Sequence, residues 1–137
     1  MITLPTPKTV KTTLLGSLIA LGLACGYSAK TTPPTAGNMP AIAQLSPANM
    51  KAGSAGFTLI VNGSKFDTNA AVNWNSTAQA TAYVSSGQLT VAIPATAIAT
   101  SGTVQVTVTN PGTSGTGLYG SGGTLPETSN NMAFTIN

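Results

Sequence analysis

Histidine and arginine are absent from the 137 residues, and the chain has a single cysteine, Cys25. Without histidine there is no Ser-His-Asp triad and no histidine-rich metal site. One cysteine excludes a disulfide bond within the chain. The carboxylates are Asp67 and Glu127, which would have to act as a pair or in a calcium site helped by carbonyl oxygens. We therefore expect no enzymatic activity and no cofactor.

Charged side chains are scarce throughout the chain. They make up 5% of the residues, against roughly 25% in soluble domains. The formal net charge is +3, but three of the five lysines precede residue 31, and the later charges cancel: Lys51, Lys65, Asp67 and Glu127. Because nothing remains to neutralise phosphates, we expect no nucleic-acid partner. Thr, Ser, Asn and Gly take the place of charge, which is typical of exported β-structure.

Long apolar runs are also missing, with one exception at residues 14–24, LLGSLIALGLA. These eleven residues are too few to cross a bilayer as a helix, which takes about twenty. Lys8 and Lys11 precede the run and small residues follow it, as in a secretory signal peptide. The sequence therefore predicts a signal peptide over residues 1–24 and an exported protein.

Cys25 stands directly after the apolar run. Its position resembles the lipobox of bacterial lipoproteins, in which the cysteine becomes the first mature residue and carries a lipid. Ala24 fits this pattern, although Gly22 stands where the family prefers a branched apolar residue. The resemblance implies lipidation at Cys25 and, with Gly26 next in place of Asp, an outer-membrane location. Gly22-Leu23-Ala24 also fits ordinary signal peptidase, so a secreted or periplasmic protein stays open, as does an uncleaved anchor.

Residues 26–40, GYSAKTTPPTAGNMP, contain three prolines and no apolar periodicity. Proline favours extended polyproline chain, and the Thr, Ala and Gly residues add flexibility. At about 3.1 Å per residue this segment would reach about 45 Å. The sequence therefore predicts that residues 25–40 are the lipidation site and a flexible tether, which lifts a following domain from the membrane.

From residue 41 onward apolar and polar residues alternate with a period of two, the pattern of half-buried strands. The clear runs are residues 57–63, 71–75, 88–94, 103–112 and 132–137, and the weaker ones are residues 41–47 and 81–84. About seven strands without sustained helical spacing predict an all-β sandwich, with Trp74 in its core. Asn62-Gly63 and Ser86-Gly87 supply turn residues between strands.

Several of these pieces resemble the IPT/TIG domain. The most specific are Leu45-Ser46-Pro47, GFTLIVNG at 56–63, VNWN at 72–75 and VTVTNP at 106–111. The resemblance covers residues 41–137 and implies an immunoglobulin-like fold, although the chain lacks the cysteine pair that joins the sheets of antibody domains. The family includes cell-surface receptors, transcription factors and bacterial envelope or glycan-processing proteins. It therefore implies a fold and leaves the ligand open.

One connection is longer than a hairpin needs. The twenty residues 111–130, PGTSGTGLYGSGGTLPETSN, place Leu118 and Tyr119 among glycines, whereas hairpin loops usually have two to five residues. An exposed tyrosine can stack on a sugar ring or anchor a protein contact. The alternative is that Tyr119 folds back over the open end of the core.

The two carboxylates complete the predicted surface. In an immunoglobulin-like topology the loops that carry Asp67 and Glu127 lie at the same end of the sandwich. We therefore predict a binding surface over residues 63–70 and 110–130, with solvated loop carboxylates as the alternative reading of Asp67 and Glu127.

These expectations combine into one function. We expect a non-catalytic cell-envelope lipoprotein that presents one immunoglobulin-like domain for protein or carbohydrate binding. The alternative is a structural, assembly or spacer module that pairs through edge strands, because so little charge opposes such pairing.

Overall fold

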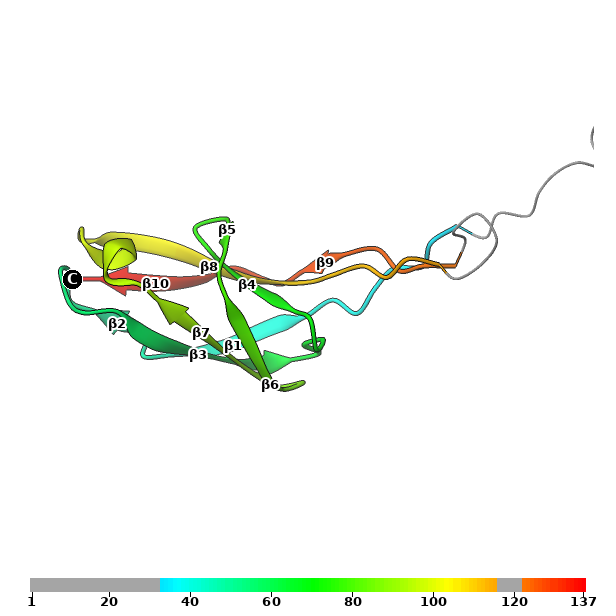
Figure 1. Ribbon diagram of the computed structural model, residues 1–137, viewed down its shortest axis with the longest axis horizontal. Helices are drawn as coiled ribbons and strands as arrows, with labels where there is room; N and C mark the ends of the chain where they lie inside the picture. Colours follow the sequence, from blue (N-terminus) through cyan, green and yellow to red (C-terminus); the bar gives the residue numbers. More distant parts are fainter. Residues whose placement is uncertain (1–32, 116–121) are drawn as a thin grey trace, which may run out of the picture. The chain divides into compact units, whose positions relative to one another are not determined.

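The computed structural model describes residues 33–115 and 122–137 (Figure 1). The predicted signal peptide, Cys25, Leu118 and Tyr119 lie outside these residues. The chain from Thr32 to Asn137 groups into one compact unit. Its described part contains ten strands and one short 3₁₀ turn, η3 (Ala95–Ile98), so the all-β prediction is confirmed. No helix in the described ranges is long and apolar enough to pass through a bilayer.

Four antiparallel strands form the first sheet, in the order β1-β3-β7-β6. Their bounds are Ala41–Ser46 for β1, Phe57–Ser64 for β3, Thr81–Ser85 for β6 and Gln88–Ile93 for β7. The alternation along β3 and β7 turns Leu59, Val61, Leu89 and Val91 inward, where each is at most 1% exposed. The apolar residues predicted to share one face of these runs therefore do so.

The second sheet has the order β2-β10-β8-β4-β5, with β9 paired to the end of β8. The bounds are Asn49–Met50 for β2, Ala71–Trp74 for β4, Thr77–Ala78 for β5, Gly102–Asn110 for β8, Glu127–Thr128 for β9 and Met132–Ile136 for β10. All neighbours are antiparallel except β2 and β10. The strands β2, β5 and β9 were not predicted, because two residues are too few to show alternation.

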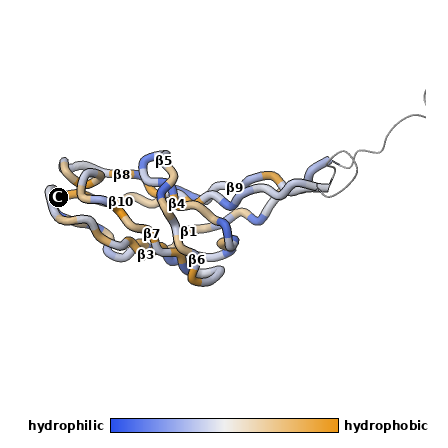
Figure 2. Tube along the Cα trace, in the orientation of Figure 1, coloured by the Kyte–Doolittle hydropathy of each residue, from blue (hydrophilic) through white to orange (hydrophobic). Residues whose placement is uncertain are grey.

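The core lies between the sheets and is centred on aromatic rings. Phe134 is fully buried, and its ring centroid lies 5.0 Å from that of Trp74 and 5.6 Å from that of Phe57. Trp74 is 6% exposed, which confirms its predicted place in the core. Figure 2 shows that the apolar residues concentrate in the strands of the sandwich.

The outer face of the second sheet carries neutral polar side chains in place of charges. The Asn73 amide donates to the hydroxyls of Thr109 at 2.9 Å and Thr107 at 3.3 Å, across from β4 to β8. The Thr109 hydroxyl in turn lies 3.1 Å from that of Thr128 on β9. Cross-strand hydroxyl and amide pairs of this kind stabilise a sheet without ion pairs.

Gly63 does not form a turn as predicted, but lies inside β3. A Cβ atom at this position would collide with the carbonyl oxygen of Ala41 and the ring of Phe66. The glycine is therefore needed for the close approach of β1. Ser86-Gly87, in contrast, forms the predicted turn between β6 and β7.

A two-residue turn connects β4 to β5. Asn75 and Ser76 both have positive φ, 51° and 71°, as a type I′ hairpin requires. Asparagine tolerates this conformation well, whereas serine adopts it at a cost.

Candidate functional site

Asn110 organises the end of the sandwich that carries the predicted binding surface. Its side chain is 2% exposed and makes three hydrogen bonds. The oxygen accepts from the backbone N–H of Asp67 at 3.1 Å, and the amide donates to the carbonyls of Asn38 at 2.7 Å and Lys65 at 2.8 Å. This buried polar group is therefore fully satisfied, and it ties three segments that are distant in the sequence.

The sequence analysis did not predict this role of Asn110, which it included only in the alternating run of residues 103–112. A signal was present, because Asn110 continues the inward series of Val104, Val106 and Val108. A polar residue at an inward position requires hydrogen-bond partners inside the protein. The partners lie on segments that the alternation alone cannot place.

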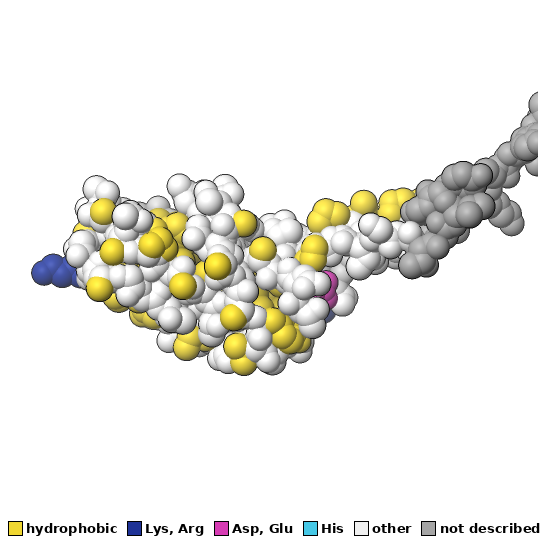
Figure 3. Space-filling model, in the orientation of Figure 1, with side chains coloured by type: hydrophobic (Ala, Val, Ile, Leu, Met, Phe, Trp, Pro, Cys, Tyr) yellow, Lys and Arg dark blue, Asp and Glu magenta, His cyan; other side chains and the backbone are white. Residues whose placement is uncertain are grey.

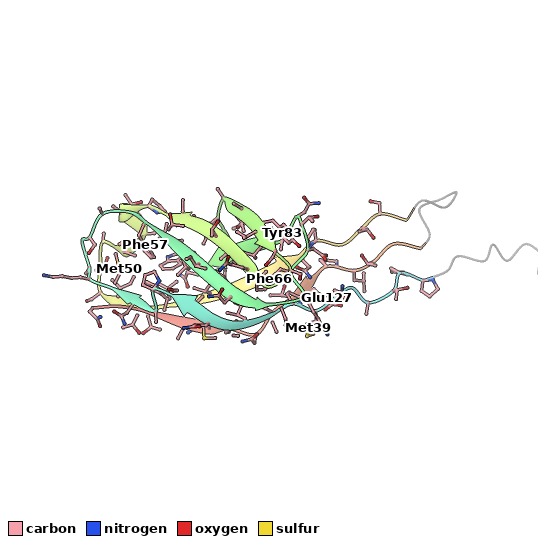
Figure 4. All side chains as sticks on the ribbon, turned by 90° about the horizontal axis from the view of Figure 1, so that it is seen from below. Met39, Met50, Phe57, Phe66, Tyr83 and Glu127 are labelled. Atoms are coloured by element: carbon pink, nitrogen blue, oxygen red, sulfur yellow. The ribbon has the colours of Figure 1, made fainter. Side chains whose placement is uncertain are left out.

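Asp67 and Glu127 are both connected to Asn110 through the backbone. Asp67 is bound through its backbone N–H, and Glu127 on β9 is the register partner of Asn110 on β8. Both side chains are half-buried, and Lys65 nearby has a positive φ of 61°. Figure 4 shows Glu127, Met39 and Phe66 at this end, with Met50 and Phe57 toward the opposite one. Figure 3 shows an acidic side chain at the same place.

In the part of the chain that the structure describes, no group of three or more His, Cys, Asp or Glu residues lies close enough to hold a metal ion. The two carboxylates can accept hydrogen bonds from a ligand's hydroxyl or amine groups.

Three stretches leave this end of the sandwich together (Figure 1), and we call them the extension: residues 33–37, 111–115 and 122–126. Residues 122–126 lie between the other two stretches, and we call them the middle chain of the extension. Its residue Thr124 exchanges backbone hydrogen bonds of 3.0 and 3.1 Å with Thr113. On the other side Thr35 donates to Gly123 at 2.9 Å and accepts from Leu125 at 3.0 Å, in parallel pairing. The extension is therefore a narrow sheet of three chains.

Each chain of the extension contributes one glycine at a point of close approach. A Cβ atom on Gly37 would collide with the carbonyl oxygen of Leu125, one on Gly112 with that of Thr124, and one on Gly123 with that of Thr113. The absence of side chains at these positions lets the three backbones lie together. The high glycine content of residues 111–130, which suggests a flexible loop, therefore also permits tight packing of backbone against backbone.

Residues 33–40 differ from the flexible tether that the sequence predicts. Thr35 is hydrogen-bonded to the middle chain, Asn38 accepts from Asn110, and Pro40 is fully buried. The reason is that backbone groups of Thr35 and Asn38 find partners in Gly123, Leu125 and Asn110, which are far away in the sequence. Likewise, the described part of the long loop 111–130 is two paired chains and β9.

A concave feature elsewhere in the described residues lacks the polar groups of a binding site. A shallow hollow of about 360 Å³ lies at the ends of β3 and β7, lined by Gly56, Phe57, Thr58, Ala92, Ile93 and Pro94. None of these side chains is charged, so the hollow lacks the convergent polar groups that orient a ligand in a typical site.

The IPT/TIG domain family matches residues 40–125, more than half of the chain. No curated protein and no solved structure matches it significantly. Domains of this family are non-enzymatic, immunoglobulin-like modules that commonly serve in binding or as spacers.

Proposed function

The chain belongs to the IPT/TIG family, and we propose that it is a non-catalytic lipoprotein of the bacterial cell envelope. In this proposal it is exported, attached to the outer membrane through a lipid on Cys25, and binds a protein or glycan with residues 63–70 and 110–130. No cofactor takes part. The apolar run before Cys25 supports export, and the scarcity of titratable side chains supports a role without chemistry.

The observation that carries the proposal is the parallel pairing of Thr35 with Thr124. It brings the N-terminal segment to the sandwich along the extension. Cys25 precedes Thr35 by ten positions, a span of at most about 35 Å. A lipid on Cys25 would therefore hold the domain from the extension side. The opposite end, where Asn137 bonds to Met50 and Gly53 to Ile98, would face away from the membrane.

This arrangement narrows the class of ligand. The surface around Asp67, Asn110 and Glu127 lies at the attached end of the sandwich. A ligand bound there would lie between the domain and the membrane, as a glycan close to the membrane or an exposed segment of a membrane protein does. Tyr119 and Leu118 would supply stacking and apolar contact, and the carboxylates would accept hydrogen bonds.

Attachment is tested by the mass and location of the mature protein. We expect a lipid-modified Cys25 at the mature N-terminus and recovery of the protein in the outer-membrane fraction. Cys25→Ser should release it, whereas Tyr119→Ala should stay in the membrane. An unlipidated mature protein in the soluble fraction would favour the secreted or periplasmic alternative.

Ligand binding is tested separately, with purified peptidoglycan as the glycan probe. We expect Tyr119→Ala to weaken co-sedimentation about tenfold without a change in melting temperature. Tyr27→Ala, which removes a tyrosine outside both the proposed surface and β6, serves as the control. If the Tyr119→Ala and unmodified proteins bind peptidoglycan equally, the proposed surface is not the glycan-binding site. If the unmodified protein does not bind peptidoglycan, the proposed ligand is a protein.

The extension itself favours a second candidate function, a spacer that holds the domain at a distance from its attachment. Its described residues carry no charged side chain and are joined through backbone groups. If Tyr119→Ala changes the binding of neither peptidoglycan nor a protein ligand, the spacer function explains the structure better.

A further inference from the structure

The two lateral sides of the sandwich are finished in different ways. On one side the Asn130 side chain accepts from the N–H of Ile42 at 2.9 Å and donates to its carbonyl at 3.1 Å. It thus occupies backbone groups of β1 as a neighbouring strand would. The Ser129 hydroxyl accepts from the N–H of Val108 at 2.9 Å, so side chains occupy backbone groups of β1 and β8 on this side.

On the other side β6 ends the first sheet. Among the strands that the structure describes, β6 pairs with β7 alone. At its start β6 is tied to the facing sheet, because the Thr81 hydroxyl accepts from the N–H of Val72 on β4 at 2.9 Å. The N–H of Gln79 just before β6 donates to the carbonyl of the same Val72 at 2.9 Å. Beyond Thr81, no strand of the described residues covers the outer edge of β6, and this part of the edge is open.

The open edge is apolar. Four large apolar side chains are exposed in the described ranges, and two of them are adjacent on β6: Tyr83, 40% exposed, and Val84, 53% exposed. Tyr83 is the register partner of Leu89, which is fully buried. Directly opposed residues point to the same face, so Tyr83 continues the inner apolar layer to the surface. Figure 3 shows apolar side chains gathered where β6 lies in Figure 1.

The edge also lacks most of the features that keep strand edges apart. Natural edges are protected by lysine, proline, inward charges or bulges. Residues 79–86, QATAYVSS, contain no charge and no proline. A register shift between Tyr83 and Ser85 is a protective irregularity, and it limits regular pairing to residues 81–83, with Val84 directly beside them.

We propose that β6 is a self-association edge, at which two copies of this chain pair their β6 strands antiparallel about a twofold axis. A second copy is the partner because such an interface matches the same patch with itself. An uncharged strand then meets no like charge, and the charges of the described residues cancel, so little repulsion opposes the contact. Tyr83 and Val84 form the apolar contact. The inference goes beyond the proposed function and does not depend on lipidation.

The size of the edge sets the strength of the pairing. A single five-residue strand buries far less than the roughly 1,200–2,000 Å² of a stable interface. The dimer should therefore be weak in solution and form at high concentration. Attachment of many copies to one membrane would raise their effective concentration and favour it.

Sedimentation of the chain from residue 25 onward, carrying Cys25→Ser, tests the proposal. We expect a monomer at about 10 μM and a growing dimer fraction toward about 1 mM, the range of a weak interface. Val84→Lys places like charges in the contact and should weaken dimerisation at least tenfold. Leu125→Lys changes another exposed apolar residue, on the extension, and should leave the dimer intact. Both positions are exposed, so both variants should keep the melting temperature.

Cross-linking locates the contact. Tyr83→Cys in the Cys25→Ser background should give a disulfide-linked dimer under mild oxidation, and Leu125→Cys should not. The proposal would be overturned if the chain stayed monomeric up to about 1 mM. It would also be overturned if Val84→Lys and Leu125→Lys weakened the dimer equally.

Discussion

In the sandwich, side chains such as Leu59 and Phe134 are fully buried between two sheets, and their packing holds the strands together. In the extension, the large apolar residues are exposed, with Met39 next to it at 60% and Leu125 within it at 49%, and the contacts run between backbone groups. One region depends on the hydrophobic effect and the other on hydrogen bonds between chains that glycine allows to meet. The two regions should therefore respond differently to the same kind of substitution.

The largest effect is expected in the sandwich core. Trp74→Ala removes a ring that packs against Phe134 and should cost about 3–5 kcal/mol of the free energy of unfolding. Domains of this size have about 5–15 kcal/mol in total. Chemical denaturation measures the loss. Leu125→Ala in the extension is the control, and a comparable loss there would contradict the division between the two regions.

A glycine-to-alanine pair compares the regions most directly. Gly63→Ala in β3 forces a methyl group against the Ala41 carbonyl and Phe66 and should cost about 3 kcal/mol globally. Gly123→Ala creates a similar collision with the Thr113 carbonyl. We expect the extension to open by itself, because few apolar side chains pack there, and the global cost should then stay below about 0.5 kcal/mol.

Hydrogen exchange distinguishes the two glycine variants. Gly123→Ala should abolish the protection of the amide protons of Thr35, Thr113 and Thr124, and leave that of β3 unchanged. If Gly123→Ala lowered the global stability as much as Gly63→Ala, the extension would be part of the cooperative core.

Asn110 joins the two regions, and its loss should have an intermediate effect. Asn110→Ala leaves the N–H of Asp67 and the carbonyls of Asn38 and Lys65 without their partner and should cost about 2 kcal/mol. Exchange at residues 65–67 should become faster. Asn73→Ala is the matched control, because its hydroxyl partners are half-exposed and water can replace it at a cost of about 0.5 kcal/mol. Equal losses for the two variants would deny Asn110 its connecting role.

The smallest effect is a gain at the hairpin turn. Ser76→Gly relieves a positive φ of 71°, and after the larger entropy of the unfolded glycine chain is subtracted, about 0.5 kcal/mol should remain. A thermal melt of both proteins checks the sign. Ser86→Gly, at a turn position without positive φ, should lose a little stability, and a gain there as well would point to a cause other than φ.

The sequence predicts the two regions to unequal degrees. Alternation identifies β3, β4, β7, β8 and β10 because each has one apolar face, and that signal is local. The extension has no such signal, because Thr35 and Thr124 are far apart in the chain and pair through groups that every residue carries. Asn110 lies between these cases. Its inward position can be read from the valines before it, but its partners at Asn38, Lys65 and Asp67 cannot.

The candidate binding surface could also be predicted only in part from the sequence. Topology indicates the end of the sandwich at which Asp67 and Glu127 lie, because it depends on strand order. The contribution of Leu118 and Tyr119 remains a prediction, since both lie outside the described residues. Sequence reasoning also overlooked that the N-terminal segment shares this end.

The parallel pairing of residues 33–37 with the middle chain of the extension has a mechanical consequence. A force that pulls the N-terminus away from the sandwich acts along these two chains. The bonds of Thr35 to Gly123 and Leu125 are then loaded in shear together, and they do not unzip one after another. The bond from Asn110 to Asn38 takes up the load behind them, so tension reaches β1 only after these attachments have failed.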